Sequence, residues 1–290
     1  MDWGTSNFRA FRLNEDGAIV ARRCSPRGIL RVEGGQFAEV LVEEVGDWLA
    51  QGEKHILLCG MIGSRQGWIE GEYLRCPIGT SDLANSVSRV PFPGADVRLI
   101  PGVLGADADG IPEMMRGEET EAVGVFEVHE GAGLVCLPGT HSKWVHLRDR
   151  RIMSFLTCMT GEVYSALRKC TILGRMMTAE SSIDEAAFLR GVARSADSGG
   201  LLHHIFGVRT LALANQLDEE LSASYLSGLL IGHEARAVMP PAAHVHLVGA
   251  APLCSLYAQA IEACGGTFTL EDEDAAARGL AVIGRRLKWT

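Results

Sequence analysis

The sequence lacks the marks of several large classes of protein. None of its 8 cysteines stands in a C-x-x-C pair, and no run of Lys and Arg interrupts a chain whose formal net charge is -9. Thiols scattered through apolar runs, such as Cys59 and Cys136, are typical of a reducing compartment rather than of a disulfide framework. The acidic balance argues against a broad face for nucleic acid. We therefore expect a cytoplasmic protein that does not bind nucleic acid.

Long apolar runs are missing as well. The most apolar stretch, residues 225–231, is followed directly by a segment that contains His233, Glu234 and Arg236, and it is far too short to span a bilayer. With 47% hydrophobic and 22% charged residues, the composition is that of an ordinary globular protein. We expect no membrane partner, and the length suits two domains.

Two familiar nucleotide-binding signatures are also absent. The chain has no G-x-x-x-x-G-K-[ST] segment and no G-x-G-x-x-G placed after a predicted strand. These glycine loops are how P-loop and Rossmann proteins hold phosphate groups. A nucleotide bound by this sequence would need another architecture.

What the chain does contain is an alternation of strands and helices. Short apolar runs bounded by glycine or turn residues predict strands at 8–13, 18–22, 55–59, 97–100, 134–137, 143–147, 245–248 and 268–270. Helical spacing predicts helices at 37–48, 160–167, 223–237, 253–264 and 274–286, and a short one within 111–124. This alternation indicates an α/β fold. A strand, glycine turn and strand open the chain and recur after the linker at 131–133, so we predict two domains, 1–132 and 133–290.

The first candidate site is the turn at residues 2–7, DWGTSN. Gly4 allows the backbone to approach a phosphate, and the N–H and hydroxyl groups of Thr5 and Ser6 are suitable donors. A carboxylate at Asp2 is suited to hydrated Mg²⁺, which prefers one or two carboxylates together with phosphate oxygens and water. An ordinary loop has the same composition, so this turn alone does not decide between the two interpretations.

The second candidate, residues 138–143 (PGTHSK), repeats the pattern of the first. Gly139 and Thr140 correspond to the phosphate-facing positions, while His141 and Lys143 add a titratable ring and a cation. Two such turns facing each other would clamp a triphosphate from both sides. Taken singly, His141 reads as a structural histidine and Lys143 as a solvated strand end; the repeat favours function.

A third, weaker candidate is the strand-to-helix turn at residues 247–252. Small residues at Gly249 and Ala250 would let a base or ribose lie against the backbone. A generic strand–helix turn looks the same. We predict that these two residues contact the nucleoside.

Two polar clusters suggest a pocket for a second substrate. The first, residues 63–68, follows a buried strand and offers Ser64, Arg65 and Trp68. The second supplies Arg116, Glu118 and Glu119. An arginine can hold a carboxylate in a bidentate fork, and a glutamate can accept from sugar hydroxyls. A charged surface turn would have the same composition as the second cluster.

Together these segments resemble the acetate and sugar kinase, Hsc70 and actin superfamily, in which two RNase H-like (actin-like ATPase) domains hold a nucleotide in the cleft between them. Residues 2–7 resemble its first phosphate motif, 138–143 its second, and 248–251 its adenosine motif. The closer resemblance is to the 2-dehydro-3-deoxygalactonokinase family. It is carried, in the family's order along almost the whole chain, by DWGTSNFRAF from Asp2, GMIGSRQGW from Gly60, IPGVLG from Ile100, MRGEET from Met115, LPGTHSKWV from Leu137, MTGEVY from Met159 and LSGLLIGHE from Leu226.

This resemblance implies phosphorylation of 2-dehydro-3-deoxy-D-galactonate on its 6-hydroxyl, with ATP as donor and Mg²⁺ as cofactor, in galactonate breakdown. It also implies that Asp2 is the metal-linked carboxylate and that Gly4, Thr5, Gly139 and Thr140 face the phosphates. Catalysis would consist mostly of positioning and charge neutralisation.

The general base is an open question at this stage. Many sugar kinases of the superfamily carry an Asp in the second phosphate motif, where this chain has Thr140 and His141. His141 is a candidate because imidazole titrates near neutral pH. Alternatively, the loose transition state of phosphoryl transfer needs little help from a base.

One feature departs from the implied fold. A central strand should lead into Asp2, yet only Met1 precedes it in this sequence. Without that strand its neighbours would lose ladder partners and an apolar face. We expect the natural start to lie upstream, with about five to eight further apolar residues.

Other interpretations use the same motifs. A kinase of another 2-keto-3-deoxy sugar acid would differ only in the placement of side chains around one hydroxyl. A non-catalytic nucleotide-binding switch would keep the phosphate turns but would not need the clusters around Arg65 and Arg116. A sugar-responsive regulator of transcription is disfavoured, because no basic helix-turn-helix segment is present. A homodimer is the expected form if the chain self-associates.

Overall fold

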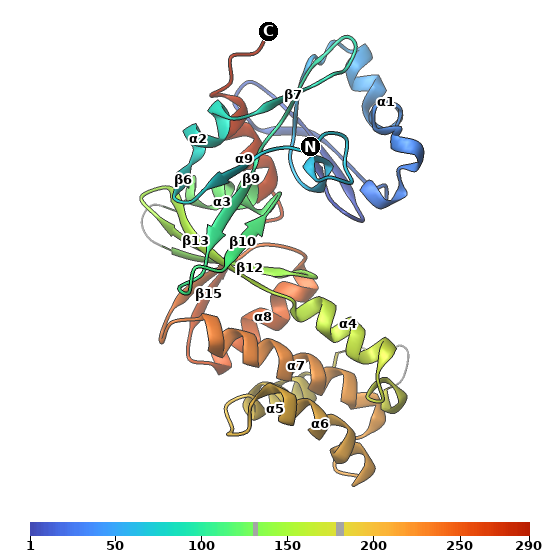
Figure 1. The fold of residues 1–290 in the computed structure, drawn as a ribbon, viewed down its shortest axis with the longest axis vertical. Helices are drawn as coiled ribbons and strands as arrows, with labels where there is room; N and C mark the ends of the chain where they lie inside the picture. The colour runs from blue at the N-terminus through green and yellow to red at the C-terminus, as the bar shows by residue number, and fades with distance from the viewer. Residues whose placement is uncertain (130–132, 178–182) are drawn as a thin grey trace. The chain divides into compact units, whose positions relative to one another are not determined.

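A computed structural model describes residues 1–129, 133–177 and 183–290 (Figure 1). Most of the predicted linker at 131–133 therefore lies outside the described residues. Internal contacts divide the chain into two compact units. The first consists of Met1–Ala132, Val145–Phe155 and Asp272–Thr290, and the second of Gly133–Trp144 and Leu156–Glu271.

The predicted domains, 1–132 and 133–290, have one boundary in common with these units, between residues 132 and 133. The first unit also takes in two later segments, 145–155 and 272–290. The last helix, α9 (Ala275–Gly284), belongs to the first unit because it packs against α3 (Glu118–Phe126). A Cβ on Gly279 of α9 would lie 1.9 Å from the Thr120 carbonyl oxygen, so the two helices touch backbone to backbone. This long-range packing is not visible in the local pattern of the sequence.

The first unit contains three small sheets. Their orders are β1-β2-β3, β4-β8-β7 and β10-β9-β5. The strands are β1 (Asp2–Trp3), β2 (Phe8–Leu13), β3 (Ile19–Ser25), β4 (His55–Leu58), β5 (Tyr73–Arg75), β7 (Ser88–Val90), β8 (Asp96–Leu99), β9 (Gly102–Ala106) and β10 (Pro112–Met115). A parallel bridge between Asp2 and Cys59 joins β1 to the end of β4. Helices α1 (Phe37–Ala50) and α2 (Thr80–Asn85) complete the unit with α3 and α9.

The core of this unit explains why its elements form where they do. Trp3 is fully buried and makes edge contacts with Phe8 and Phe37, at ring-centroid distances of 4.9 and 5.8 Å. The buried residues of α1 recur at helical spacing, as the sequence predicted, and β4 is the predicted buried strand. These contacts fix the hairpin that follows the first turn.

The helix predicted within 111–124 is partly wrong. Residues 112–115 form β10, which pairs antiparallel with β9, and α3 begins only at Glu118. Met114 is 51% exposed while Met115 is 2% exposed, the alternation of a strand. Pairing with β9 therefore overrides the helix propensity of the two methionines.

The second unit combines a sheet with a layer of helices. The strand order β15-β14-β11-β12 is built from β11 (Gly133–Leu137), the start of β12 (Ser142–Arg148), β14 (His244–Leu247) and β15 (Thr267–Leu270). β14 runs parallel to both β11 and β15. The end of β12 and most of β13 (Arg151–Cys158) belong to the first unit, where β13 pairs with β6 (Ile78–Gly79). The helices are α4 (Thr160–Cys170), α5 (Glu185–Arg194), α6 (Gly200–Leu213), α7 (Glu219–Val238) and α8 (Ala251–Ala263).

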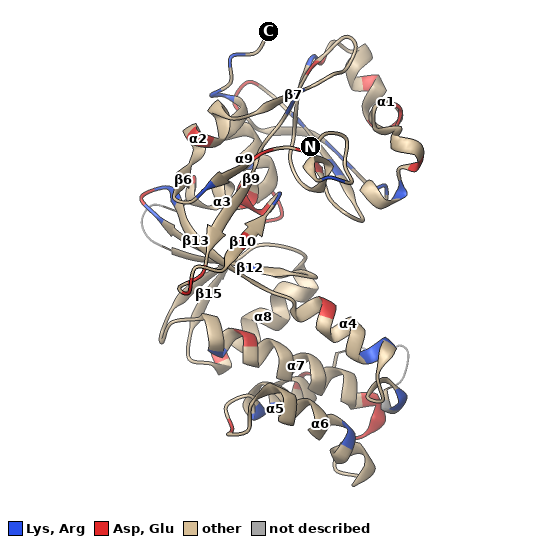
Figure 2. Cartoon of the chain, in the orientation of Figure 1, with Lys and Arg blue, Asp and Glu red and all other residues tan. Residues whose placement is uncertain are grey.

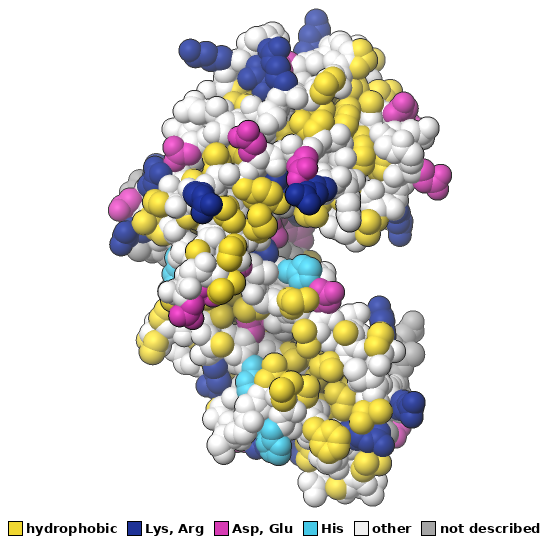
Figure 3. Space-filling view, viewed as in Figure 1, with side chains coloured by type: hydrophobic (Ala, Val, Ile, Leu, Met, Phe, Trp, Pro, Cys, Tyr) yellow, Lys and Arg dark blue, Asp and Glu magenta, His cyan; other side chains and the backbone are white. Residues whose placement is uncertain are grey.

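Helix α7 is buried along most of its length. A Cβ on Gly228 would lie 1.9 Å from the Phe188 carbonyl oxygen of α5, and one on Gly191 of α5 would lie 2.1 Å from the Tyr225 carbonyl oxygen. At these two positions the helices therefore pack backbone to backbone, which restricts the rotation of α7. Apolar side chains remain exposed along α6, with Leu202 83% and Phe206 53% exposed, and Figure 3 shows hydrophobic side chains at the surface over these helices. The predicted homodimer stays a prediction.

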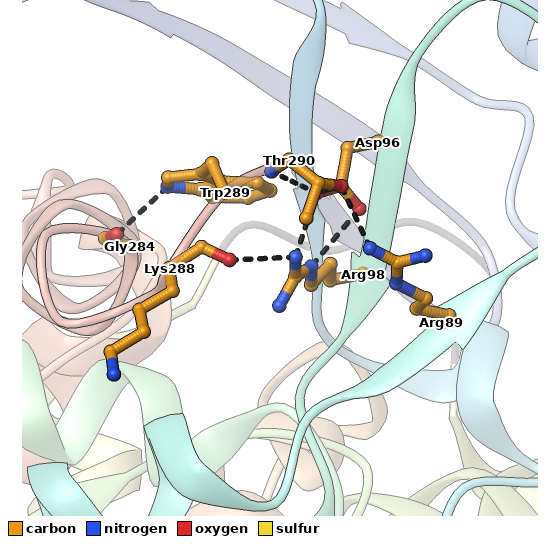
Figure 4. Close-up of polar contacts among 7 residues, drawn as sticks. All are labelled: Arg89, Asp96, Arg98, Gly284, Lys288, Trp289 and Thr290. Carbon is orange, nitrogen blue, oxygen red and sulfur yellow. Dashed lines mark hydrogen bonds and ion pairs between the residues drawn. The ribbon is translucent and has the colours of Figure 1, made fainter.

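The last residues pack on β7 and β8 (Figure 4). Thr290 N–H donates to Asp96 Oδ2 at 3.0 Å, and Arg98 donates to both oxygens of the same carboxyl, from Nη2 to Oδ2 at 2.7 Å and from Nε to Oδ1 at 3.0 Å. The Arg98 guanidinium lowers the pKa of the Asp96 carboxyl. Trp289 stacks on His55 of β4 with ring centroids 4.8 Å apart. This segment adds a further layer to the first unit.

Residue Met1 lies between β2 and β4. Its ammonium donates to the Leu57 carbonyl at 2.7 Å, its carbonyl accepts from Cys59 N–H at 2.9 Å, and burial lowers the pKa of the amino group. Beside it is a cavity of about 470 Å³, lined largely by apolar residues of β2, α1, β4 and α9. The predicted upstream strand stays a prediction. Over the described residues, no helix is long and apolar enough to cross a membrane.

Candidate functional site

The first turn, residues 4–7, presents its backbone donors outward. The carbonyl oxygens of Gly4, Thr5 and Ser6 accept from N–H groups of residues 28–30 at 3.0 to 3.3 Å, while Gly4 N–H is used within the turn by the Asn7 carbonyl. For the N–H groups of Thr5 and Ser6, no acceptor exists among the described residues. Both residues are exposed. The turn therefore offers two N–H groups and two hydroxyls to an anion.

Asp2 lies beside this turn in an ion pair with Arg9. Arg9 Nε donates to Asp2 Oδ2 at 2.8 Å, and its Nη2 also contacts Glu121 Oε1 at 3.0 Å. The Asp2 side chain is only 14% exposed. Asp2 Oδ1 accepts no hydrogen bond in the part of the chain that the structure describes. One oxygen is thus held by the protein and the other is open to a ligand.

Three glutamates open helix α3, visible in Figure 2 as acidic residues at its start. Gly117, with φ 114°, precedes the helix. Glu118 Oε2 accepts from Arg116 N–H at 2.9 Å, and Glu119 accepts from Gly117 N–H at 2.7 Å and from Thr120 Oγ1 at 3.0 Å. Carboxylates at a helix N-terminus satisfy backbone donors that have no intrahelical partner.

Burial changes the acidity of two of these groups. It raises the pKa of Glu119, which is fully buried, to about 8, with the neighbouring Glu118 charge as the next cause. It also raises the pKa of Glu121 to about 7, against the opposing effect of Arg9. Both groups therefore carry a proton for part of the time near neutral pH.

Close backbone approach brings the segments GMIG and RGEE to Asp2. A Cβ on Gly60, where φ is 94°, would lie 2.8 Å from the Trp3 carbonyl oxygen and 2.9 Å from Asp2 Oδ1. A Cβ on Gly117 would lie 3.1 Å from Gly60 Cα. Only glycine allows the three segments to meet here. Two of the sequence segments that the resemblance singled out therefore converge on the first turn.

Arg116 is placed differently from what the sequence suggested. It is 6% exposed, its Nη2 donates to the carbonyls of Gly71 and Glu72 at 2.6 and 3.3 Å, and its guanidinium lies 4.2 Å from the centre of the Tyr73 ring. Its Nη1 is buried and has no hydrogen-bond partner within the described ranges. Arg116 fastens the loop at 60–73 to α3. Its predicted contact with a substrate carboxylate stays a prediction.

The cluster at 63–68 is not brought together around one ligand. Arg65 is 87% exposed and pairs with Glu70 at 2.8 Å. Trp68 is half-buried and packs against Phe37 and Phe92, with ring centroids 6.4 and 6.1 Å away. Ser64 Oγ is buried without a hydrogen bond to any described residue. Of these three, Arg65 has the exposure of a group that can reach a ligand.

Sequence reasoning missed Arg9 and Glu121. The signal for Arg9 was available, because a hairpin around residues 4–7 places it opposite Asp2. Glu121 gave no such signal, since it meets Arg9 across 112 positions of sequence.

In the second unit, the turn at 138–141 rests on the start of helix α4. Glu162 N–H donates to the Thr140 carbonyl at 3.0 Å, and a Cβ on Gly161 would lie 2.5 Å from the Gly139 carbonyl oxygen. An added Cβ on Gly139 would meet no atom of the described residues within 4 Å. The carbonyl groups of Gly139 and Thr140 thus lie against the start of α4, and the outer face of Gly139 is open. The N-terminus of an eleven-residue helix lies alongside, which favours an anion there.

His141 is exposed and Lys143 is buried. His141 is 47% exposed, and its Nε2 lies 2.5 Å from Glu162 Oε2. Lys143 is 6% exposed, and its Nζ donates to Thr157 Oγ1 at 3.0 Å. Lys143 is therefore not a solvated strand end. The structure leaves His141 as the accessible titratable group of this turn.

The strand-to-helix turn at 247–252 lies against the second turn. Val248 N–H donates to the Cys136 carbonyl at 3.0 Å, and a Cβ on Gly249 would lie 3.6 Å from the Pro138 carbonyl oxygen. Gly249 has φ 145°, a conformation that favours glycine. Ala250, which precedes α8, is exposed. The two predicted nucleotide motifs of this unit are therefore neighbours.

Almost the whole chain is similar to known proteins. The family model described as 2-keto-3-deoxy-galactonokinase matches residues 2–283. A protein of Rhizobium meliloti (strain 1021) described as a probable 2-dehydro-3-deoxygalactonokinase is 36% identical, over 99% of this chain and 96% of its own. The 2-dehydro-3-deoxygalactonokinase of Escherichia coli (strain K12) is 33% identical, over 95% of this chain and 93% of its own.

Solved structures agree with the predicted fold class. The crystal structure of a Sinorhizobium meliloti protein assigned as a 2-dehydro-3-deoxygalactonokinase has a TM-score of 0.88 and 36% identity, and covers 98% of this chain and 94% of its own. An activator of the 2-hydroxyisocaproyl-CoA dehydratase from Clostridium difficile, with bound ADPNP, has a TM-score of 0.51 at 14% identity, over 98% of this chain and 93% of its own. The prediction of an α/β fold of the actin-like ATPase type is confirmed.

We predict that replacing Glu119 by Gln changes how stability depends on pH. The folded state raises the pKa of Glu119 from 4.5 to about 8, so its contribution to stability is fully present below pH 4.5 and is lost as the pH rises through 8. Glu119→Gln cannot ionise. Its free energy of unfolding should therefore rise relative to the wild type with increasing pH, by at most about 1.4 kcal/mol per pH unit.

Urea unfolding without Mg²⁺, at intervals between about pH 5 and pH 8, measures this difference. The control is Glu43→Gln, because the Glu43 side chain is 61% exposed on α1. Its difference from the wild type should stay nearly constant. Parallel curves for the wild type and Glu119→Gln would contradict the prediction.

Proposed function

The chain belongs to the 2-keto-3-deoxy-galactonokinase family, and on that basis we propose that it phosphorylates 2-dehydro-3-deoxy-D-galactonate on its 6-hydroxyl with ATP, in galactonate catabolism. The observation that carries this proposal is the full-length family match, residues 2–283, which includes both glycine turns. In the reaction, a bond forms between the substrate O6 and the γ-phosphorus. The bond between that phosphorus and the β,γ-bridging oxygen breaks, and the 6-hydroxyl proton leaves to a base or to water.

The two turns are proposed to bind the phosphates of ATP. This proposal is supported by the hydrogen bonds of both turns, whose carbonyl groups accept from neighbouring N–H groups of the protein. The N–H and hydroxyl groups of Thr5, Ser6 and Thr140 are left facing outward. Gly249 and Ala250, next to the second turn, are proposed to contact the nucleoside. Donors that are already in place when negative charge develops need no reorganisation during the reaction.

Asp2 is the residue proposed to hold Mg²⁺, through the water shell of the ion. Its chemistry fits, because Oδ1 accepts no hydrogen bond from the described residues while Oδ2 is anchored by Arg9. Bound Mg²⁺ would neutralise charge on the phosphates. Arg9 keeps the Asp2 carboxylate oriented, and Glu121 in turn holds Arg9.

The substrate site is proposed to draw on the surroundings of the first turn. Arg65 is exposed enough to pair with the substrate carboxylate, while Glu118 is a candidate acceptor for sugar hydroxyls. Trp68, Arg116 and Glu119 stay part of the proposed substrate site, although each already makes contacts within the protein. A cytoplasmic location and a homodimer remain part of this proposal.

A coupled assay of ADP release across a panel of 2-keto-3-deoxy sugar acids tests the function. We expect the galacto isomer to have the highest kcat/KM, because one hydroxyl orientation is enough to misplace the acceptor. Asp2→Asn, close in shape to Asp2, should lower kcat roughly hundredfold or more if the carboxylate orients Mg²⁺. Preference for another sugar acid would reassign the substrate, and full activity of Asp2→Asn would remove Asp2 from its role.

Gly139→Ala tests the second turn. In the part of the chain that the structure describes, the added methyl group meets no atom within 4 Å, so folding should be unaffected. It would stand where a phosphate approaches, and we expect KM for ATP to rise about tenfold or more. Gly133→Ala is the matched control, since its Cβ would make only ordinary contacts with His246, at 3.6 and 3.8 Å. An unchanged KM for ATP in Gly139→Ala would be evidence against phosphate binding at this turn.

His141→Gln tests the general base. If the exposed His141 ring takes the 6-hydroxyl proton, the variant should lose the acid limb of the pH–rate profile, and kcat should fall about hundredfold. Glu162→Gln removes the hydrogen-bond partner of the ring but keeps the ring itself, so it should retain the acid limb. An unchanged acid limb and unchanged turnover in His141→Gln would exclude His141 as the base.

A further inference from the structure

Glu234, near the end of helix α7, is a buried carboxylate with three hydrogen-bond donors. Ser142 Oγ and Trp144 Nε1 both donate to Glu234 Oε1 at 2.6 Å, and the Tyr257 hydroxyl donates to Glu234 Oε2 at 2.8 Å. Glu234 is 6% exposed, and its three partners are 0 to 1% exposed. None of the sequence motifs assigned above to nucleotide or substrate includes this residue.

Such a carboxylate is costly to bury and therefore restricts its surroundings. Removing an ionised group from water is unfavourable unless its lone pairs are satisfied, and donors to a charged acceptor form shorter and stronger bonds than neutral pairs do. Indole N–H can only donate, so Trp144 has no alternative hydrogen-bonding mode. Burial, followed by the effect of Glu234, raises the pKa of Tyr257, which keeps the phenol a donor. Glu234 is therefore the acceptor in all three hydrogen bonds.

The three donors come from the two elements that carry the nucleotide motifs. Ser142 and Trp144 lie on β12, on either side of Lys143 and directly after the turn at 138–141. Tyr257 lies on α8, which begins immediately after Gly249 and Ala250. The Glu234 side chain thus accepts hydrogen bonds from β12, which follows the second phosphate turn, and from α8, which follows the adenosine turn.

Helix α7, which carries Glu234, packs closely on α5. Gly228 and Gly232 let α7 approach the backbone of α5, where a Cβ on Gly232 would lie 3.0 Å from Val192 Cα and 2.6 Å from Ser195 Oγ. This close packing on α5 restricts the rotation and sliding of α7. Glu234 therefore presents its two oxygens in a fixed direction.

We propose that Glu234 is a positioning residue for the nucleotide: it fixes the second phosphate turn and the adenosine turn relative to each other, so that both meet one ATP molecule in register. This inference rests on the proposed function, since it takes both turns as nucleotide contacts. Glu234 acts through Ser142, Trp144 and Tyr257 and touches no reacting atom.

Binding of ADP to the purified full-length protein, measured by calorimetry, tests the link without depending on the sugar acid. Trp144→Phe removes one of the two bonds from the strand to Glu234, and Tyr257→Phe removes the bond from the helix. Each should weaken ADP binding roughly three- to tenfold. Because both act through one carboxylate, the double variant should lose clearly less than the product of the two effects. Independent effects that multiply would overturn the proposal.

Two Glu234 variants separate positioning from general support of the core. Glu234→Gln keeps an oxygen for Ser142 and Trp144, while its amide can donate to the Tyr257 oxygen, so it should bind ADP within about twofold of the wild type. Glu234→Leu loses all three bonds and should bind ADP about tenfold or more weakly. Glu234→Leu with wild-type affinity, or Glu234→Gln as impaired as Glu234→Leu, would contradict the proposal.

The matched control is Tyr225→Phe. Tyr225 is 2% exposed on α7, and its hydroxyl has no hydrogen bond to a described residue. It removes a phenol hydroxyl from the same unit and should leave ADP affinity unchanged. Loss of affinity in Tyr225→Phe equal to that in Tyr257→Phe would show that any such change in the core has this effect, against the proposal.

The two levels of inference fail differently. A wild-type protein that binds no ADP would overturn the proposed function and this inference with it. A wild-type protein that binds ADP, with multiplicative effects of the Trp144 and Tyr257 changes, would overturn only the role of Glu234. If Glu234→Leu does not fold, the two single replacements and their combination still decide the question.

Discussion

A loop that binds phosphate through its backbone must have its own carbonyl groups bonded elsewhere, because every N–H turned toward a ligand leaves a C=O to be satisfied by another part of the chain. In the first unit, residues 28–30 bond the carbonyls of Gly4, Thr5 and Ser6. In the second, the start of α4 bonds that of Thr140. If both turns bind phosphate as proposed, residues 28–30 and the start of α4 meet this requirement.

Several carboxylates lie near the first turn: Asp2, Glu121, which pairs with Arg9, and the glutamates at the start of α3. Burial raises the pKa of Glu119 to about 8 and of Glu121 to about 7, which reduces the negative charge near neutral pH. Arg9 and the start of α3 balance part of what remains. Asp2 differs from the buried Glu119 because one of its oxygens has no partner among the described residues. Charge around the turn is therefore regulated by burial as much as by composition.

The secondary structure of segments with regular apolar spacing was predictable from the sequence. The structure of segments that depend on contacts with distant parts of the chain was not. The helix at 37–50, the strand at 55–58 and the buried helix around residue 230 follow from apolar spacing alone. Residues 112–115 form a strand only because β9 lies beside them. Arg116 reads as a free cation in the sequence, but the carbonyls of Gly71 and Glu72 bind it. Its partners lie more than 40 positions away, beyond the reach of local pattern.

The sequence by itself determined the order of the glycine turns, the α/β alternation and the family resemblance, because these depend on residue types at short spacing. Only the tertiary structure decided which side chains lie around the turns and what they contact. It paired Arg9 with Asp2 and Glu121, buried Lys143, left His141 exposed, and brought Ser142, Trp144 and Tyr257 to Glu234. Those relations join residues up to 112 positions apart, and burial, the main cause of the raised pKa values at the first turn, is a property of the folded chain alone.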